Sequence, residues 1–528
     1  MSIYPHAPAI HSLNMDILSY IFTLNADMFP YEGRNALHTT RITSQVCQNW
    51  RDLMLATPTL WARLIDIDCL SDPWNIGWTE ELIRRSGAAL LWIRVESCLI
   101  DEDGDDSDVA EFLLHIIYHN WHRIQKLVVH DQLDDLTFHL IQKAYESPAP
   151  HLETFDVSFN YMEGYEYDCP PTSFPSPFGG HAPMLRRFRL DNYTLDQRAP
   201  WLCQLHSLVL DGEYNVCDVL AVLMATHSLQ ELKINLQVEA NGDTPQSSPP
   251  FPIVSFPHLR SLDCTGQSRS CTTLLDHIEI SPGCSLIMSV SNSLEETDEQ
   301  HLSAVDAFNR HARRFLKSNV FRTVSLTRTP RYLSSLPLAR IDTSPVDPQY
   351  CITITLADKH ALFAAILNRL THLDLSGTTT LRLCSDGPLD PSFFSRLSSL
   401  DTICVNEMTL RHLVLLQDDM NTTEKPDILI PSLTVLDFVF DHNADPNRGR
   451  PTTDHIAVAK KFILSRTHNG YPIAMLNITR CSPFDLAPNL DGLAECKGLK
   501  VLYRLSKMSG IFEHICGSGK AAKHIVTI

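Results

Sequence analysis

Histidine, cysteine and acidic residues, the side chains that most often carry catalysis or bind metal ions, are scattered along this 528-residue chain. The 24 histidines and 15 cysteines build none of the short motifs that bring such groups together. The sequence has no HExxH, no GxSxG, no GxGxxG after an expected strand and no CxxC pair. Gly517-Ser518-Gly519-Lys520 has the form of a phosphate-loop end, but His514 occupies the upstream glycine position and Ala521 replaces Ser or Thr. The sequence therefore predicts no catalytic residue, no metal site and no cofactor.

Two acidic stretches, residues 101–108 and 295–299, have the composition of segments that attract a cation or a basic partner. The first stretch lacks the ligand spacing and the closing Glu of a calcium-binding loop. We interpret both stretches as solvated connections.

A long proline-containing loop offers a different chemistry, the recognition of another protein. Its rings include Tyr161, Tyr165, Tyr167 and Phe174. Aromatic side chains are frequent in protein-binding surfaces, so these four are candidate substrate-binding residues. The alternative is that the rings pack against the body of the fold.

Composition and charge limit the class of partner. With 44% hydrophobic and 20% charged residues, the chain is typical of a soluble globular protein. A formal net charge of −19 would repel nucleic acid and anionic membrane surfaces. No stretch approaches the roughly 18–20 apolar residues of a spanning helix, and residues 1–22 lack the features of a signal peptide. We expect a protein of the cytoplasm and/or nucleus with reduced cysteines and neither nucleic-acid nor membrane partners.

Helical periodicity organises the first sixty residues. One short amphipathic helix is predicted from Leu13, with Asn14 as its cap and Asp16 in the first turn, where the helix dipole favours negative charge. A second helical region follows, and Pro58 ends it after Thr57. The apolar positions are Leu13, Ile17, Leu18, Ile21, Phe22, Leu37, Ile42, Val46, Cys47, Trp50, Leu53, Met54, Leu60 and Trp61.

The order of residues in this segment resembles that of an F-box, in the style of the expanded fungal families. The matching stretches are Leu13-Asn14-Met15-Asp16-Ile17-Leu18 with Ile21-Phe22, Ser44-Gln45-Val46-Cys47-Gln48-Asn49-Trp50-Arg51, and Thr57-Pro58-Thr59-Leu60-Trp61. The likeness covers about a tenth of the chain. Asn14 stands where the family usually has Pro, a tolerable change because Asn caps helices well. The loop over residues 25–35 is longer than in compact F-boxes.

The resemblance implies a three-helix domain whose apolar face docks on a Skp-type adaptor, which in turn bridges to a cullin that carries the ubiquitin-transfer machinery. The adaptor-binding residues predicted on this basis are Leu13, Ile17, Leu18, Ile21, Phe22, Val46, Cys47, Trp50, Leu60 and Trp61. Cys47 and Trp50 suit the core of the domain equally well. A plain helical bundle with buried tryptophans is the alternative for the whole segment.

Beyond Trp61 the chain repeats one apolar pattern, with apolar residues at positions i, i+3 and i+5. The last two positions suit a strand with one buried face, and the first turns the chain in from the preceding loop. Helical segments are predicted in the returns at residues 109–119, 216–225 and 359–370, and another at 302–315. The copies begin at Leu90, Ile124, Leu152, Leu185, Leu205, Leu229, Leu259, Phe321, Leu370, Leu400 and Leu433.

This pattern resembles leucine-rich repeats, whose strands stack in parallel along a concave face. The asparagine that the family prefers eight residues after the first apolar position is mostly missing, so we expect an irregular horseshoe. The predicted fold is mixed α/β, with a three-helix F-box domain and flanking helix over residues 1–70 and a leucine-rich-repeat-like α/β solenoid over 71–528. Its register is poor at about 265–355, and a capping tail covers about 440–528. An ordinary α/β sheet is the alternative.

Together the two resemblances predict a non-catalytic substrate adaptor of a Skp/cullin/F-box (SCF) ubiquitin ligase complex. The F-box would dock on the Skp-type adaptor, and the solenoid would bind an unknown protein substrate for ubiquitin-dependent degradation. The second interpretation is a protein-interaction scaffold that is not coupled to ubiquitin transfer. The third, an enzyme with a dispersed active site, has no motif in its favour.

Overall fold

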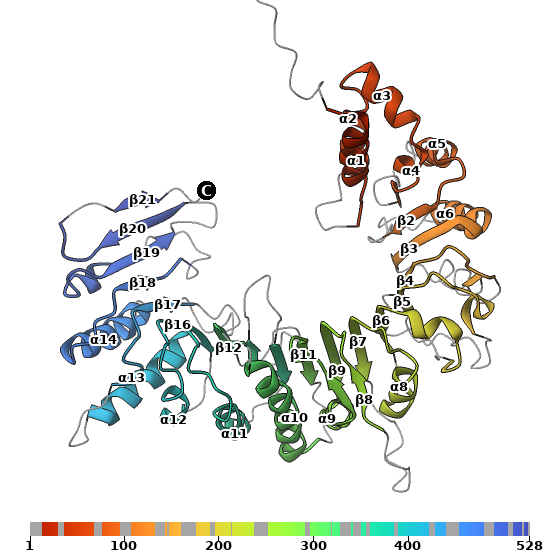
Figure 1. Ribbon diagram of the computed structural model, residues 1–528. Coiled ribbons are helices and arrows are strands. Elements are labelled where there is room, and N and C mark those ends of the chain that lie inside the picture. Colours follow the sequence, from red (N-terminus) through yellow and green to blue (C-terminus); the bar gives the residue numbers. More distant parts are fainter. Residues whose placement is uncertain are drawn as a thin grey trace, which may run out of the picture. The chain divides into compact units, whose positions relative to one another are not determined.

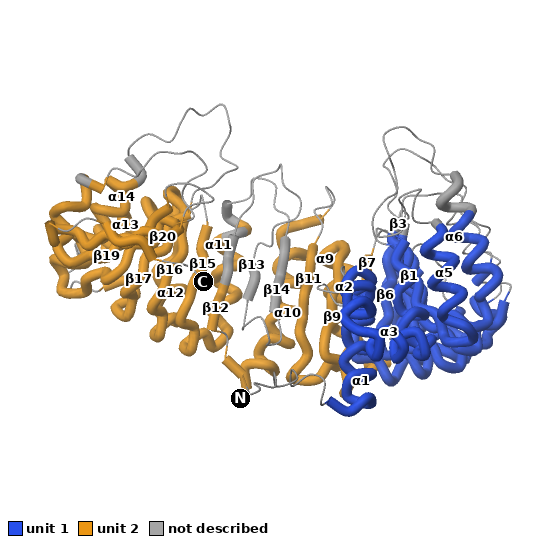
Figure 2. The backbone as a smooth tube through the Cα atoms, turned by 90° about the horizontal axis from the view of Figure 1, so that it is seen from above, with its two compact units in different colours: residues 1–233 blue, residues 234–528 orange. Residues whose placement is uncertain are grey.

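The computed structural model divides the chain into two compact units, unit 1 (Met1–Lys233) and unit 2 (Ile234–Ile528) (Figure 2). Both units are mixed α/β and contain a large, mainly parallel sheet, with helices along one face of the strands (Figure 1). The structure describes residues 13–29, 36–67, 76–95, 107–131, 143–144, 147–159, 176–190, 196–212, 214–236, 252–290, 296–317, 319–320, 322–327, 339–341, 350–354, 360–384, 389–421, 428–439, 454–479, 490–504, 510–519 and 522–525.

Unit 1 begins with short helices. They are α1 (Met15–Asn25), α2 (Ala36–Thr43), α3 (Gln48–Leu55) and α4 (Pro58–Trp61). As predicted, the Asn14 side chain caps α1 by accepting the backbone N–H of Asp16 at 3.1 Å. The ring of Phe22 on α1 meets the ring of Trp50 on α3 edge-on, with centroids 5.1 Å apart. These contacts pack α1 against the helices that follow it.

The strands of unit 1 pair in parallel in the order of the sequence, each one beside its predecessor. They are β1 (Ile65–Asp66), β2 (Leu91–Val95), β3 (Ile124–Asp131), β4 (Thr154–Phe159), β5 (Arg187–Leu190) and β6 (Ser207–Leu210), and β7 (Glu231–Leu236) follows across the boundary between the units. The connections contain α5 (Ile76–Ser86), α6 (Ser107–Asn120), η5 (Trp121–Arg123), η6 (Pro177–Gly180), η7 (Pro200–Gln204) and α8 (Val216–Leu223). Alternate strand residues such as Leu127, Phe155 and Phe188 are buried and lie in register.

The sheet of unit 2 is parallel except in two places. Strands β9, β11 and β14 are parallel, β13 runs antiparallel between β14 and β12, and β12 continues in parallel through β15 to β19. β20 and β21 then add antiparallel strands, while β8 and β10 form a separate pair. The elements are β8 (Val254–Phe256), β9 (Ser261–Gly266), α9 (Ser268–His277), β10 (Ile278–Ile280), β11 (Ser285–Val290), α10 (Asp298–Leu316), β12 (Thr323–Thr327), β13 (Ala339–Ile341), β14 (Tyr350–Ile354), α11 (His360–Leu370), β15 (Thr380–Cys384), α12 (Pro391–Phe394), β16 (Thr402–Val405), α13 (Glu407–Asn421), β17 (Val435–Phe438), α14 (Asp454–His468), β18 (Met475–Asn477), η8 (Asp491–Leu493), β19 (Lys500–Arg504), β20 (Ile511–Ile515) and β21 (Lys523–Ile525).

Backbone hydrogen bonds join the starts of successive strands, and we call this series the strand-start ladder. In unit 1 the N–H of Glu153 donates to the carbonyl of Gln125 at 2.7 Å, and the N–H of Arg186 donates to that of Glu153 at 2.8 Å. Later rungs follow the same pattern, and most of them come directly after an apolar residue; Thr379, which follows Thr378, is an exception. The rungs of unit 1 are Gln125, Glu153, Arg186, His206 and Gln230, and one series in unit 2 is Arg322, Thr379, Asp401, Thr434, Ala474 and Lys500.

An aromatic cluster fills the middle of unit 1. Its rings belong to Trp121, Phe155, Phe178, Phe188 and Trp201, and neighbouring centroids such as those of Phe188 and Trp201 lie 4.8 Å apart. Phe178 has a φ of 61°, a left-handed backbone that costs a non-glycine residue about 1–2 kcal/mol. Because its side chain is fully buried, ring packing offsets that strain.

Buried arginines satisfy the carbonyl groups of two loops. Arg123 donates to the carbonyls of Gly87 at 2.6 Å and Ala89 at 3.0 Å. Arg466, fully buried, donates to the carbonyls of Leu429 at 2.6 Å and Ile430 at 2.9 Å. Burial lowers the pKa of Arg466 to about 10, so the guanidinium stays charged at neutral pH. Carbonyl oxygens thus stabilise this cation within the fold.

A third buried arginine, Arg94 on β2, connects the sheet of unit 1 to the helices before it. Its Nη2 donates to Asp66 Oδ2 on β1 at 2.5 Å, and its Nη1 donates to the carbonyl of Met28 after α1. Both charged side chains are at most 4% exposed. One cation therefore holds the segment after α1 against two strands.

Most of the predicted elements are confirmed, including α6, α8, α10 and α11 in their expected segments. One repeat is wrong. Leu370 ends α11, and Leu373 and Leu375 lie in the turn that follows, because β15 begins only at Thr380. The strand uses Leu381 and Leu383 as its buried positions.

The boundary predicted near residue 70 falls inside unit 1, since the chain divides between Lys233 and Ile234. None of the helices in the described ranges has both the length and the apolar character needed to cross a membrane. The likeness of the repeats to a solenoid stays a prediction.

Replacing Asp66 by Ala would leave the Arg94 guanidinium buried without its acidic partner. Breaking one side of a buried ion pair costs about 3–5 kcal/mol, and we expect the free energy of unfolding of unit 1 to fall by that amount in urea titrations followed by circular dichroism. Arg187→Met is the control, because Arg187 and Glu231 form a pair whose side chains are 48% and 54% exposed. That change should cost less than about 1 kcal/mol. Equal losses in the two variants would contradict a special role for the Arg94 pair.

Candidate functional site

Helix α1 is apolar on two faces. Leu18 and Phe22 point into unit 1 and are 4% and 2% exposed. Ile17, Tyr20 and Ile21 are 49%, 64% and 37% exposed, and Leu24 is also exposed. These four outward residues follow the i, i+3, i+4, i+7 spacing of a single helix face. Large apolar side chains in that pattern are typical of a helix that docks on another protein.

Further exposed apolar side chains lie on the same short helices or beside them. We define the N-terminal apolar surface by its members, which are Met15, Ile17, Tyr20, Ile21, Leu24, Ile42, Val46 and Leu55. Elsewhere in the described part of the chain, most exposed large apolar residues, such as Tyr118, Met184 and Ile253, are widely separated in the sequence, and only Met408 and Leu415 share a helix, α13. Single exposed apolar residues are normal on a protein surface, whereas a concentration of them marks an interaction site.

Buried contacts hold the helices that carry this surface. The indole N–H of Trp61 donates to the carbonyl of Met54 at 2.8 Å and so fixes α4 to the end of α3. The guanidinium of Arg85 on α5 lies 4.5 Å from the centre of the Trp61 ring, and that of Arg41 on α2 lies 4.4 Å from the Trp78 ring. The apolar surface is therefore carried by helices with a packed interior.

The predicted adaptor-binding residues fall into three groups. Ile17, Ile21 and Val46 are exposed and belong to the N-terminal apolar surface. Leu13, Cys47 and Trp50 are half-buried. The remaining four are buried and form the core beneath the surface: Leu18, Phe22, Leu60 and Trp61.

Sequence reasoning missed five members of the surface, namely Met15, Tyr20, Leu24, Ile42 and Leu55. The spacing of Ile17, Tyr20, Ile21 and Leu24 was the signal that would have found the stripe on α1. The phenol of Tyr20 is the most exposed large apolar side chain of α1.

The candidate substrate-binding rings of Tyr161, Tyr165, Tyr167 and Phe174 lie outside the described residues. Phe178, which follows them, is fully buried in the aromatic cluster of unit 1. The described end of this loop therefore packs on the fold.

A row of charged side chains crosses the open face of the unit 1 sheet, away from the helices. His130 Nε2 on β3 lies 3.0 Å from Asp156 Oδ1 on β4. Arg189 on β5 lies 4.0 Å from the same carboxylate and 3.3 Å from Asp211 after β6. These side chains are between 17% and 33% exposed, so they remain accessible to a partner.

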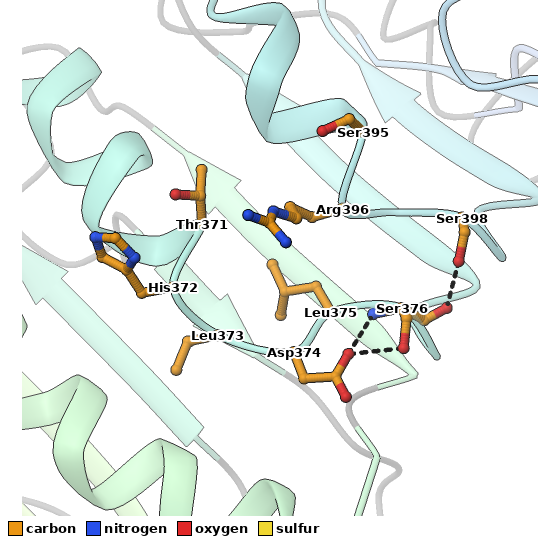
Figure 3. A pocket seen from close by; sticks show the side chains of 9 residues that line it. All are labelled: Thr371, His372, Leu373, Asp374, Leu375, Ser376, Ser395, Arg396 and Ser398. Carbon is orange, nitrogen blue, oxygen red and sulfur yellow. Dashed lines mark hydrogen bonds between the residues drawn. The ribbon is translucent and has the colours of Figure 1, made fainter.

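A pocket of about 450 Å³ in unit 2 is polar but has no catalytic arrangement (Figure 3). It lies between the turn after α11 and the turn after α12, with His372, Asp374 and Arg396 on its walls. Asp374 accepts hydrogen bonds from the side chain and the backbone of Ser376, which lowers its pKa. A carboxylate that stays ionised opposes anion binding by Arg396. We therefore assign no ligand and no reaction to this pocket.

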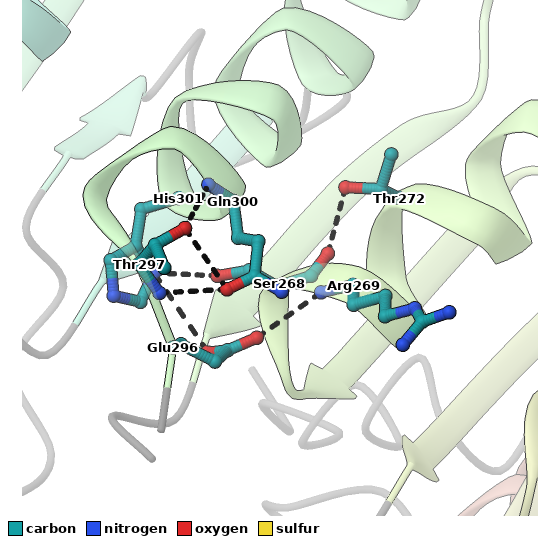
Figure 4. Close-up of polar contacts among 7 residues, drawn as sticks. All are labelled: Ser268, Arg269, Thr272, Glu296, Thr297, Gln300 and His301. Carbon is teal, nitrogen blue, oxygen red and sulfur yellow. Dashed lines mark hydrogen bonds and ion pairs between the residues drawn. The ribbon is translucent and has the colours of Figure 1, made fainter. Parts of the chain in front are cut away.

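Ser268, Glu296 and His301 come together in unit 2 and invite comparison with a nucleophilic triad (Figure 4). Ser268 Oγ lies 2.6 Å from His301 Nδ1, and Glu296 Oε2 lies 3.9 Å from that same nitrogen. A triad needs the serine and the acid on opposite ring nitrogens. All three side chains are also buried, and Glu296 Oε1 accepts the backbone N–H of Arg269 in the first turn of α9. The cluster has the geometry of a helix cap.

Within the described ranges no three histidine, cysteine or acidic side chains gather in a metal-binding arrangement. Burial raises the pKa of Cys284 to about 12, and a hydrogen bond with Cys271 together with burial raises that of Cys264. These thiols stay protonated at neutral pH and are poor nucleophiles.

Comparison with protein-family models found no match for this chain, and comparison with curated proteins found none either. The interpretation of the N-terminal apolar surface therefore depends on its residues and their geometry.

The two faces of α1 should respond differently to truncation. Tyr20→Ala and Leu24→Ala remove exposed groups, and each should change the free energy of unfolding by no more than about 0.5 kcal/mol. Phe22→Ala empties a buried site beside Trp50 and should cost about 3–5 kcal/mol. Thermal unfolding followed by circular dichroism measures the difference. A large loss for Tyr20→Ala or Leu24→Ala would mean that the outward face is part of the core.

Proposed function

We propose that this chain is a substrate-recognition subunit of a Skp/cullin-type ubiquitin ligase. The observation that carries the proposal is the outward face of α1, where Ile17, Tyr20, Ile21 and Leu24 leave apolar area in contact with water. Because the N-terminal segment resembles an F-box, we propose a Skp-type adaptor as the partner that binds this face. Burial of such area at about 25 cal/mol per Å² drives association.

The second half of the proposal concerns the target. Parallel strands that follow one another in sequence present a continuous open face in each unit, which supports the likeness to leucine-rich repeats. In unit 1 this face carries His130, Asp156, Arg189 and Asp211, whose charges suit polar recognition of a protein. Our proposal assigns target binding to these open sheet faces, in a solenoid that follows the F-box.

The chain would act by proximity. A target held on the sheet and a ubiquitin-charged enzyme held through the adaptor and cullin would share one complex, which raises the effective concentration of the target lysine. No residue of this chain takes part in bond formation under this mechanism. The proposed setting is the cytoplasm or nucleus, where such ligases work.

Affinity capture with the full chain tests the adaptor contact. Ile17→Asp combined with Ile21→Asp places two carboxylates on the outward face of α1, and we expect recovery of the Skp-type adaptor and the cullin to fall at least about tenfold, which corresponds to 1.4 kcal/mol. Leu415→Asp on α13 is the matched control, because Leu415 is 58% exposed but lies in unit 2. Its recovery should equal that of the unchanged chain.

Circular dichroism of both variants must show folded protein for the comparison to hold. If the unchanged chain recovers neither adaptor nor cullin, the ligase proposal is wrong and the chain is an interaction scaffold. If it recovers the adaptor without the cullin, coupling to ubiquitin transfer is wrong.

A further inference from the structure

Among lysine and arginine, only arginine occurs in residues 1–125. This stretch contains eight arginines and no lysine, and the first lysine of the chain is Lys126. The whole chain has 43 such residues, of which 13 are lysines. The eight arginines are Arg34, Arg41, Arg51, Arg63, Arg84, Arg85, Arg94 and Arg123.

The amine of Lys126 is engaged inside unit 1. Its Nζ lies 3.6 Å from the centre of the Trp92 ring and 4.9 Å from that of Phe29. The side chain is half-buried, and desolvation lowers its pKa. The next described lysine, Lys143, has its Nζ 4.9 Å from the Tyr118 ring.

Contacts explain arginine at some of these positions. Arg94 and Arg123 each use several guanidinium N–H groups, and Arg84 holds both carboxylate oxygens of Glu81. Arg51 is different. It is exposed on α3, between Val46 and Leu55 of the N-terminal apolar surface, and among the described residues its side chain makes no hydrogen bond, ion pair or ring contact. Lysine has about the same helix propensity as arginine, so the helix itself does not require a guanidinium here.

The two cations differ in the chemistry that a ubiquitin ligase performs. A neutral lysine amine attacks the thioester carbonyl of a ubiquitin-charged enzyme, an isopeptide bond forms, the enzyme's cysteine leaves as a thiolate, and the amine loses its proton to solvent. A guanidinium does not lose its proton in proteins and cannot be the nucleophile. Arginine therefore keeps positive charge without offering an acceptor.

We infer that the docking end of this chain is built without ubiquitin acceptors, so that a ligase assembled on it modifies the target and spares the docking helices. This inference rests on the proposed function. It predicts that a lysine introduced between α1 and β2 of unit 1 would be modified by ubiquitin.

A reconstituted reaction tests the inference with the full chain, the Skp-type adaptor, the cullin and a charged conjugating enzyme. Arg84→Lys adds one amine on α5, at a side chain that is 71% exposed and lies outside the N-terminal apolar surface. We expect ubiquitin at position 84 by peptide mass spectrometry, with severalfold faster self-modification. Arg84→Gln removes the charge without adding an amine and should match the unchanged chain. In the unchanged chain, modified lysines should begin only after Lys126.

Adaptor binding is measured in the same samples, so that failure of the proposed function can be distinguished from failure of the inference about ubiquitin acceptors. Absence of adaptor binding by the unchanged chain overturns the proposed function, and the inference with it. If the adaptor binds and the enzyme discharges, but Arg84→Lys gains no ubiquitin at position 84, the inference alone is wrong. Modification of Lys126 in the unchanged chain would also overturn it.

Discussion

The strand-start ladder is the constraint on which both sheets depend. In the two ladder series, each parallel strand is placed by a backbone N–H that donates to the start of a neighbouring strand earlier in the chain, as Glu153 does to Gln125 and Thr434 does to Asp401. A buried apolar residue precedes most of these rungs, for example Leu152 and Leu433. Since the rung itself uses only main-chain atoms, any side chain can occupy it. Irregular repeats without an asparagine ladder are therefore compatible with regular strand pairing.

The sequence predicted most strands because two buried positions two residues apart are a strong local pattern. It failed at Leu370, Leu373 and Leu375 because spacing of three and five also fits the end of a helix, and only the pairing of β15 with its neighbours decides the register. Only three of the eight members of the N-terminal apolar surface were predicted, for a similar reason. Adjacent apolar residues such as Ile17 and Leu18 mark an apolar helix but do not say which of them faces the core. That choice is made by tertiary contacts, notably the one between Phe22 and Trp50.

Unit 1 has two features that are uncommon in globular proteins, a buried charge and a set of exposed apolar side chains. The two features have different consequences. The cation of Arg94 is compensated inside the fold by Asp66 and by the carbonyl of Met28. The apolar side chains of Ile17 and Leu24 have no such compensation among the described residues, because both face solvent. The buried charge is therefore compensated within this chain, whereas the exposed apolar area is the feature on which the proposed partner contact depends. The contact of Arg94 with the segment after α1 also joins the exposed helix to the sheet of unit 1.

The antiparallel strands at the end of unit 2 have a consequence for how copies of the protein behave toward one another. A row of parallel strands leaves a last edge with unsatisfied N–H and carbonyl groups, and such an edge is a template for sheet growth and fibre formation. Here β19 is followed by β20 and then by β21, which is only three residues long and begins with the exposed Lys523. A short, charged edge strand is a poor template. We therefore expect the β20–β21 hairpin to disfavour edge-to-edge growth at this end of the sheet.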